Sequence, residues 1–169
     1  MSADPEYPML EPPDSHYLRA AEGWLELGNC VEAGAELDQI ALGLRINPAV
    51  LEMRCRVFTV AKQWERLIEA SAALIAQQPH EAELYVRHAN ALFFLERTAE
   101  ARSYVLPLIN RFPDNAILQY NLACYECQLG NFDDSKSWLI KSIALNKTLL
   151  EFARQDPDLA PFWRHFTSL

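Results

Sequence analysis

The sharpest chemical pattern in the sequence is a pair of cysteines, Cys124 and Cys127, separated by two residues. Such a pair can be a redox centre where it begins a helix, because the helix dipole lowers the pKa of a thiol there. This pair instead lies in the middle of a predicted helix, and a zinc site would need two further ligands. We therefore expect two small side chains on a helix. A thiol or metal enzyme using both cysteines is kept as an alternative.

Other residue types that could do chemistry show no catalytic spacing. The four histidines are scattered, and His88 falls among packed positions, where a hydrogen-bonded, partly buried imidazole is expected. Asp133 and Asp134 begin a predicted helix, where acids stabilise the helix dipole. We find no glycine-rich phosphate loop, nucleophile elbow or recognisable carboxylate pair. The sequence therefore predicts a non-enzymatic protein with no catalytic residue, no metal and no cofactor.

Composition narrows the class of protein further. The 169 residues suit one domain, half of them are apolar, and strand-like alternation is absent, so we expect an all-α fold. The formal charge of −8 argues against a nucleic-acid binder, which needs a basic stripe, and against a polybasic membrane anchor. Neither a bilayer-spanning segment nor a secretory signal is evident. Together with four cysteines that suit reduced thiols, this predicts a cytoplasmic protein.

The elements that would position such residues repeat along the chain. Residues 118–139 read as a helix, a tight turn at Gly130 and a second helix. Stepping back by 34 residues from Gly130 gives three further turns between apolar segments, at Glu96, Lys62 and Gly28. The same step relates four small residues, which predicts that two helices approach closely at each of them. These small residues are Ala21, Cys55, Ala89 and Ala123.

This pattern resembles the tetratricopeptide repeat family over about residues 14–149. The resemblance is carried by Trp24, Gly28 and Ala33; Trp64 and Pro79; Tyr85, Ala89, Ala101 and Pro113; Leu122, Ala123, Gly130 and Phe132. Lys62 and Glu96 depart from the usual turn glycine, and Leu67 and Ser135 from the usual small residue. The resemblance implies a right-handed superhelix, an α-solenoid of four helix pairs. Their expected bounds are 14–47, 48–81, 82–115 and 116–149, followed by C-terminal capping helices in 150–169.

Local signals predict where the helices begin and end. We expect helices at 15–28, 31–46, 48–61, 64–77, 81–96, 98–111, 114–129, 132–145 and 147–155, then a short one after Pro157. Pro107 should bend the sixth. Trp24 should lie in a buried stripe. Expected helix caps are Asp14 or Ser15, Asn47, Thr98, Asp114 and Asn131.

The ends of the chain lie outside the repeats. The proline-rich residues 1–13 favour an extended or disordered arm, with docking through Tyr7, Met9 and Leu10 as the alternative. The run that starts at Asp156-Pro157 looks like the segment that closes many bacterial arrays of this family, which favours a bacterial source. The residues from 147 onward are expected to cover the last apolar face of the stack.

In this family the first helix of each pair lines a concave groove that binds a peptide or a partner helix. The groove residues carried over are Leu18, Glu22, Leu25, Glu52, Arg56, Val86, Asn90, Phe93, Phe94, Tyr120, Asn121 and Cys124. The basic clamp that holds acidic chain ends in some members is mostly missing, since its columns contain Leu18, Glu22, Met53, Glu83 and Arg87. The groove would instead have an apolar centre of exposed aromatic residues at Phe93, Phe94 and Tyr120.

The resemblance therefore implies a protein-interaction scaffold whose partner is another protein. We expect an apolar to mildly basic peptide or helix, with no nucleic acid and no membrane insertion. A secretion-type chaperone that shields apolar client segments is the main alternative. The groove could also be filled by the N-terminal arm, the C-terminal helices or a second copy, so a homo-oligomer stays open.

Overall fold

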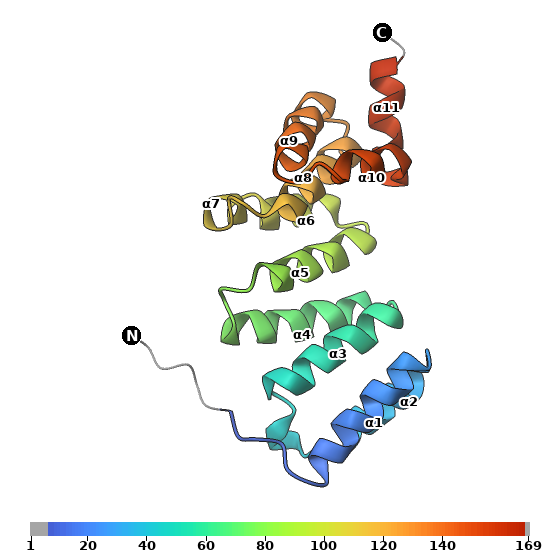
Figure 1. Cartoon of the computed structure of the whole chain (residues 1–169), viewed down its shortest axis with the longest axis vertical. Helices are drawn as coiled ribbons and strands as arrows, with labels where there is room; N and C mark the ends of the chain where they lie inside the picture. The colour runs from blue at the N-terminus through green and yellow to red at the C-terminus, as the bar shows by residue number, and fades with distance from the viewer. Residues whose placement is uncertain (1–6, 168–169) are drawn as a thin grey trace. The chain divides into compact units, whose positions relative to one another are not determined.

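The computed structural model describes residues 7–167, and the regular secondary structure in that range is entirely helical (Figure 1). The chain forms two compact units, Met1–Leu84 and Tyr85–Leu169, each of which has its own packing. We describe the two units separately. None of the helices in the described range is long and apolar enough to cross a membrane.

Unit 1 is built from two helix pairs (Figure 1). It contains α1 (Asp14–Glu26), α2 (Cys30–Gln39), the 3-10 helix η1 (Leu42–Leu44), α3 (Pro48–Val60) and α4 (Trp64–Gln77). The helices α1 and α2 pack on each other, as do α3 and α4, and α2 contacts α3. The unit ends within the first turn of α5 (Ala82–Phe94).

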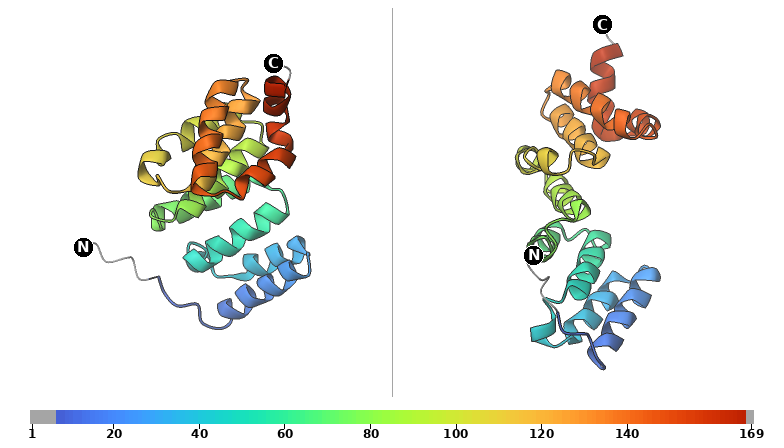
Figure 2. Two further views of the ribbon diagram at one scale, coloured as in Figure 1. Left: turned by 45° about the horizontal axis from the view of Figure 1, so that its top comes forward. Right: turned by 60° about the vertical axis from the view of Figure 1, so that its left-hand side comes forward.

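Unit 2 contains the rest of α5, its partner helix divided into α6 and α7, one further pair and a C-terminal extension. Its elements are α6 (Thr98–Val105), α7 (Leu108–Arg111), α8 (Ala116–Gln128), α9 (Phe132–Leu145), α10 (Leu149–Gln155), η2 (Pro157–Leu159) and α11 (Ala160–Thr167). The extension formed by α10, η2 and α11 lies against α8 and α9 in all views (Figures 1 and 2), and we call it the C-terminal lid. Leu159 and Phe162 anchor the lid, because both side chains are buried.

The predicted column of small residues is confirmed. Ala21, Cys55, Ala89 and Ala123 are all fully buried in the first helix of their pairs. Because no exposed surface remains at any of the four, a larger side chain would have to displace a neighbouring helix. The 34-residue step therefore corresponds to a repeated helix-to-helix contact.

The four predicted turns share one backbone conformation. Gly28 and Gly130 have φ of 76° and 80°, and Lys62 and Glu96 have φ of 53° and 61°. Each turn also repeats the same two hydrogen bonds, as when the N–H of Asn29 donates to the Trp24 carbonyl (2.9 Å) and that of Gly28 to the Leu25 carbonyl (2.9 Å). This pair of bonds is the Schellman motif, which ends a helix by a single left-handed residue.

The expected bounds of two helices are wrong. The helix expected at 31–46 ends at Gln39, where the Arg45 guanidinium donates to the carbonyls of Ile40 (2.9 Å) and Asp38 (2.5 Å). The Asp14 carboxylate accepts from the Ala41 N–H (2.8 Å), which holds the following backbone outside the helix. The helix expected at 98–111 is two helices rather than one bent helix. α6 ends at Val105 before Pro107, which lacks an N–H to continue the ladder, and α7 begins at Leu108.

Only one of the predicted helix caps is confirmed. Asn47 caps α3, its side chain accepting from the Ala49 N–H. The residue before α1 is Pro13, the residue before α6 is Arg97, and α8 is capped by Asn115. These positions replace the caps expected at Asp14 or Ser15, at Thr98 and at Asp114. Asn131 does precede α9, but its amide donates to the buried carboxylate of Glu126 (2.8 Å) instead of accepting from the helix.

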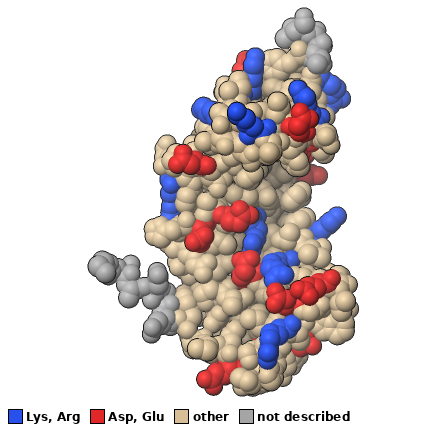
Figure 3. Space-filling model, in the orientation of Figure 1, with Lys and Arg blue, Asp and Glu red and all other residues tan. Residues whose placement is uncertain are grey.

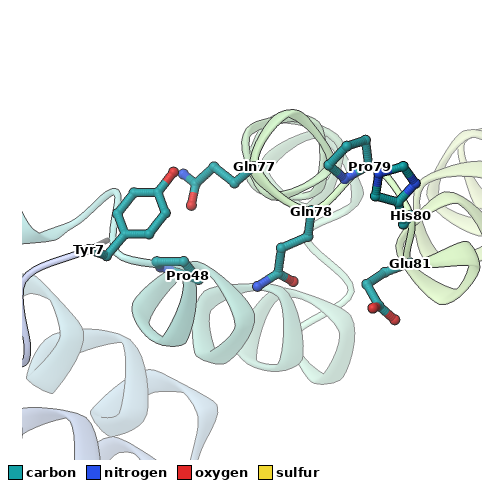
Figure 4. Close-up of a pocket in the computed structure, with 7 residues that line it drawn as sticks. All are labelled: Tyr7, Pro48, Gln77, Gln78, Pro79, His80 and Glu81. Carbon is teal, nitrogen blue, oxygen red and sulfur yellow. The ribbon is translucent and has the colours of Figure 1, made fainter. Parts of the chain in front are cut away.

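The N-terminal segment contacts unit 1 from residue 7 onward, and residues 1–6 lie outside the described range. The Asn47 amide donates to the Pro8 carbonyl (3.0 Å), and Tyr7 is half-buried. Figure 4 shows the Tyr7 ring next to Pro48, with the Gln77 side chain reaching toward it. Residues 7–11 have no regular secondary structure. Tyr7 and Leu10 are partly buried, whereas Met9, the third residue of the docking alternative, is 86% exposed.

Candidate functional site

The most exposed part of the predicted groove in unit 2 lies on α5. Asn90, Phe93 and Phe94 follow each other at helical spacing and therefore share one face of the helix. Phe94 is 55% exposed and its ring lies 6.2 Å from that of Phe93. The Asn121 amide on α8 donates to the Asn90 side-chain oxygen (2.8 Å) and joins the two helices. We call Asn90, Phe93, Phe94 and Asn121 the Phe94 surface.

The Phe94 surface has a rigid foundation. The Phe93 ring packs on the ring of Tyr125, with 5.1 Å between centroids, and Tyr125 is only 1% exposed. Phe93 is thereby anchored on the interior of the unit. An exposed aromatic residue on such a base, with a polar amide pair beside it, is a typical anchor point for a protein partner.

Three other predicted groove residues in unit 2 are not exposed. Val86, Tyr120 and Cys124 are each about 5% exposed or less. The prediction of an exposed aromatic centre that includes Tyr120 is therefore wrong. The reason lies in the C-terminal lid, because the Phe152 ring packs at 5.7 Å from that of Tyr120 and the Tyr120 hydroxyl donates to the Asp156 carboxylate (2.6 Å).

The lid contacts α8 through side chains that the sequence analysis assigned to the groove, Tyr120 and Cys124, and through Gln128. Besides the bond from Tyr120, the Gln128 amide donates to the Asp158 carbonyl (2.6 Å), and the Cys124 sulfur lies 3.9 Å from the Asp156 carboxylate. Sequence reasoning did not identify Asp156 as a partner of residues on α8. The sequence did contain a signal for this contact, the run at Asp156-Pro157 that resembles the closing segment of such arrays. The 34-residue period alone could not show that this run packs on α8.

The cysteine pair is unsuited to thiol chemistry in this environment. Cys124 and Cys127 are 5% and 2% exposed. Burial raises the pKa of both thiols, and the nearby Asp156 carboxylate raises that of Cys124 further. A reactive cysteine needs the opposite, an accessible thiol with a lowered pKa. In the described range no cluster of His, Cys, Asp and Glu could hold a metal ion.

Unit 1 contains the other part of the predicted groove. The Arg56 guanidinium on α3 binds the Glu22 carboxylate on α1 at 3.0 Å, and both side chains are almost half exposed. Leu18 and Leu25 on α1 and Glu52 on α3 are each partly buried. This surface is polar at its middle, and an exposed ion pair of this kind contributes less than about 1 kcal/mol.

A small pocket in unit 1 lies between Tyr7, the start of α3 and the end of α4 (Figure 4). Its walls are Tyr7, Pro48, Gln77, Gln78, Pro79, His80 and Glu81. The Gln77 amide donates to the Ile46 carbonyl (2.9 Å), so this side chain links α4 to the segment before α3. None of these residues has the arrangement of an acid–base or nucleophilic site.

Comparison with known proteins supports the fold. No family model and no curated protein sequence matches the chain. A solved structure of MamA from Desulfovibrio magneticus RS-1 is 15% identical with a TM-score of 0.73, covering 95% of this chain and 94% of that one. A thermophilic TPR protein of Thermus thermophilus, TTC0263, is 19% identical with a TM-score of 0.59, covering 89% of both chains. PilF of Pseudomonas aeruginosa is 19% identical with a TM-score of 0.62, covering 91% of this chain and 73% of its own.

These similarities agree with the packing described above. The repeated small-residue contacts and the repeated Schellman turns are the features expected of stacked helix pairs. The chain therefore has the all-α, helix-pair fold of tetratricopeptide-repeat proteins.

Proposed function

We propose that this protein is a non-enzymatic scaffold that binds a segment of another protein through the Phe94 surface. The observation that carries the proposal is the 55% exposure of Phe94 on a helix face that is otherwise held in place by packing and by the Asn90–Asn121 bond. Exposing a large aromatic side chain to water is unfavourable, and burying it against a partner regains about 2 kcal/mol.

The chemistry of the surface indicates the kind of partner. Phe93 and Phe94 supply apolar contact area, while the amides of Asn90 and Asn121 can bind backbone groups of a peptide or polar residues of a helix. The similarity of fold to TPR proteins supports a role in protein interaction. We therefore expect an apolar segment, carrying a basic rather than an acidic flank because the protein is acidic overall.

A displayed library of random peptides of about 12 residues tests the proposal, since binding in this mode uses short segments. The wild-type protein should enrich peptides with clustered apolar residues and Lys or Arg, with dissociation constants of about 1–100 µM. Phe94→Asp should weaken their binding by about tenfold or more, because it removes the anchor and leaves a charge in the contact.

Ile140→Asp is the matched control, because Ile140 is also an exposed apolar residue of unit 2, at 59% exposure, and it lies on α9 rather than on α5 or α8. This control should leave binding within about twofold of wild type. The proposal would be wrong if no peptide were enriched, or if Phe94→Asp and Ile140→Asp bound the enriched peptides equally well.

A further inference from the structure

The pocket between the start of α3 and the end of α4 has two polar ends with apolar surface between them. Its volume of about 360 Å³ lies within the range of about 300–1,000 Å³ that is usual for small-ligand sites. Figure 4 shows Tyr7 and Gln77 at one end of the pocket and Glu81 at the other. Between these ends the rings of Pro48 and Pro79 supply apolar surface. The pocket therefore suits an elongated molecule with a polar group at each end.

The Gln77 side chain presents an unpaired acceptor at the first end. Its amide nitrogen donates to the Ile46 carbonyl (2.9 Å), which fixes the orientation of the amide group. The amide oxygen is therefore turned the other way, and it is buried without a hydrogen-bond donor among the described residues. In Figure 4 this oxygen lies on the side of Pro48 and Gln78, which also line the pocket. Leaving a buried acceptor unpaired is unfavourable, so this end favours a ligand that brings an N–H group.

The Tyr7 ring forms another wall of the same end. The face of a tyrosine ring attracts a cation that lies within about 6 Å of the ring centroid. Tyr7 belongs to residues 7–11, which have no regular secondary structure and are tied to the start of α3 by the bond from the Asn47 amide to the Pro8 carbonyl (3.0 Å). The ring can therefore shift as a ligand enters and give it access to the buried Gln77 oxygen. An acceptor beside an aromatic ring suits an ammonium group.

The other end of the pocket is acidic. The exposed side chain of Glu81 lies there next to His80 (Figure 4). Among the described residues that line the pocket, none is Lys or Arg, so no basic wall competes for the Glu81 carboxylate. A carboxylate in such a position binds a second cation. The two ends thus ask for the same chemical group, a positively charged hydrogen-bond donor.

The charge of unit 1 also favours a cationic ligand. The described part of this unit, residues 7–84, contains twelve Asp and Glu and six Lys and Arg, which gives a formal charge of −6. In the described part of unit 2, residues 85–167, the nine acidic and nine basic residues balance. On the side drawn in Figure 3, acidic and basic side chains are interspersed over unit 1. The acidic excess therefore attracts cations to the unit in general, and the pocket walls decide where they bind.

We propose that this pocket binds a linear aliphatic diamine. One ammonium group donates to the Gln77 oxygen beside the Tyr7 ring, and the second binds the Glu81 carboxylate. The methylene chain between the two groups lies against Pro48 and Pro79. A ligand with a single charge would leave one polar end of the pocket unused, and an anion would meet an acidic wall. The site lies entirely in unit 1, so it is independent of the Phe94 surface of unit 2.

Calorimetric titration of the full chain with putrescine, cadaverine and longer linear diamines tests the proposal. The ligands are small, so the dissociation constant of the best diamine should be about 0.1–1 mM. Affinity should rise by up to about fourfold for each added methylene until the chain spans the pocket, and then fall. Pentylamine has the same chain as cadaverine but only one ammonium group, and it should bind about fivefold more weakly.

Variants at the two ends identify the binding mode. Glu81→Gln should weaken cadaverine binding by about fivefold and bring it to the level of pentylamine. Tyr7→Leu keeps an apolar wall but removes the ring, so it should weaken binding by about two- to fivefold. Gln77 is left unchanged, because its amide also holds the Ile46 carbonyl. Its part is measured by NMR instead: the side-chain amide signals of Gln77 should shift as cadaverine saturates the protein.

The matched control is Glu65→Gln, which removes the same charge from an exposed position of unit 1. Glu65 lies about 18 Å along α4 from Gln77, beyond the screening length of about 8 Å at physiological salt, so this variant should bind cadaverine like wild type. Absence of binding by every diamine would overturn the proposal and leave the Gln77 oxygen as a site for water only. Equal losses in Glu81→Gln and Glu65→Gln would also overturn it, because net charge alone would then attract the ligand.

A further comparison separates a free diamine from a lysine side chain of a partner protein, which carries the same ammonium group on an aliphatic chain. N-acetyl-lysine amide has only one ammonium group and should bind about fivefold more weakly than cadaverine. If it bound as tightly as cadaverine, the pocket would be a docking site for lysine side chains, and the proposal of a diamine site would be wrong.

Discussion

At the scale of single residues, the four turns show that the repeat imposes the same left-handed backbone conformation on different residue types. Lys62 and Glu96 adopt the left-handed conformation that Gly28 and Gly130 adopt, with φ of 53° and 61°. For a residue with a Cβ this conformation costs about 1–2 kcal/mol. The two departures from the family pattern are therefore tolerated because the packing of the helices on both sides fixes the turn.

Replacing a strained turn residue by glycine should stabilise the protein. Glu96→Gly relieves the left-handed strain, while the greater freedom of glycine in the unfolded chain offsets about 0.4–1 kcal/mol of that gain. A net stabilisation of up to about 1 kcal/mol is expected in urea unfolding.

The reverse change provides the control. Gly130→Ala should destabilise by about 1 kcal/mol from backbone strain alone, because a Cβ at Gly130 would meet no atom within 4 Å. Equal stability of wild type, Glu96→Gly and Gly130→Ala would contradict the strain argument.

His88 is a partly buried imidazole, as expected from its place among packed positions. Its ring stacks on that of Tyr104 with 4.5 Å between centroids. Burial lowers the pKa of His88 below 6.5, with Arg97 adding to this and Glu100 opposing it. The same burial raises the pKa of Tyr104 to about 12. Both shifts mean that the folded protein favours the uncharged rings.

The lowered pKa of His88 predicts a loss of stability in acid. Because the folded-state pKa lies below the unfolded value of 6.5, the stabilisation is complete above pH 6.5 and is lost as the pH falls through 6.5 toward the folded pKa. Comparing the free energy of unfolding of wild type and His88→Gln from about pH 7.5 to 5.5 isolates this residue from other titrating groups. The difference should shift in favour of the variant as the pH falls, and a constant difference would contradict the prediction.

At the scale of elements, a buried charge joins α6 to α8. Glu126 is 1% exposed, and its carboxylate accepts from the Arg102 guanidinium (2.5 Å) and from the Asn131 amide (2.8 Å). The equivalent positions in the two preceding pairs are Phe58 and Leu92, which are buried and apolar. One repeat position is thus filled by an ion pair where its counterparts are filled by hydrophobic packing.

Removing one partner of this pair should cost much more than removing both. Arg102→Met leaves the Glu126 carboxylate buried without its cation and should destabilise by about 3–5 kcal/mol. Adding Glu126→Leu restores the apolar character of the position and should recover most of that loss. Thermal or urea unfolding of the two variants provides the measurement. If the double variant were as unstable as Arg102→Met alone, the penalty would not come from the buried charge.

At the scale of the whole chain, packing is repeated but exposure and charge are not. The first-helix position that is buried at Phe58 and Leu92 is exposed at Trp24, and Leu27 beside it is exposed as well. The first 44 residues contain nine Asp and Glu and one Arg, and three of the four lysines lie at 136, 141 and 147. Exposure and charge therefore differ among repeats whose packing is otherwise similar.

The sequence by itself determined the all-α class, the 34-residue step, the four buried small residues and the positions of the four turns. These features depend on contacts between residues close in the chain and on a spacing that repeats, so pattern reasoning can find them. The bounds of the four repeats stay a prediction.

Only the tertiary structure decided which groove residues are accessible. Tyr120 and Cys124 are buried because a segment 36 and 32 residues further along the chain, at Asp156, folds back onto α8. Trp24 is exposed for the converse reason, since it occupies a position that elsewhere faces a preceding helix. Burial depends on what lies next to a residue in space, and at the two ends of a repeat array the period no longer tells what that neighbour is.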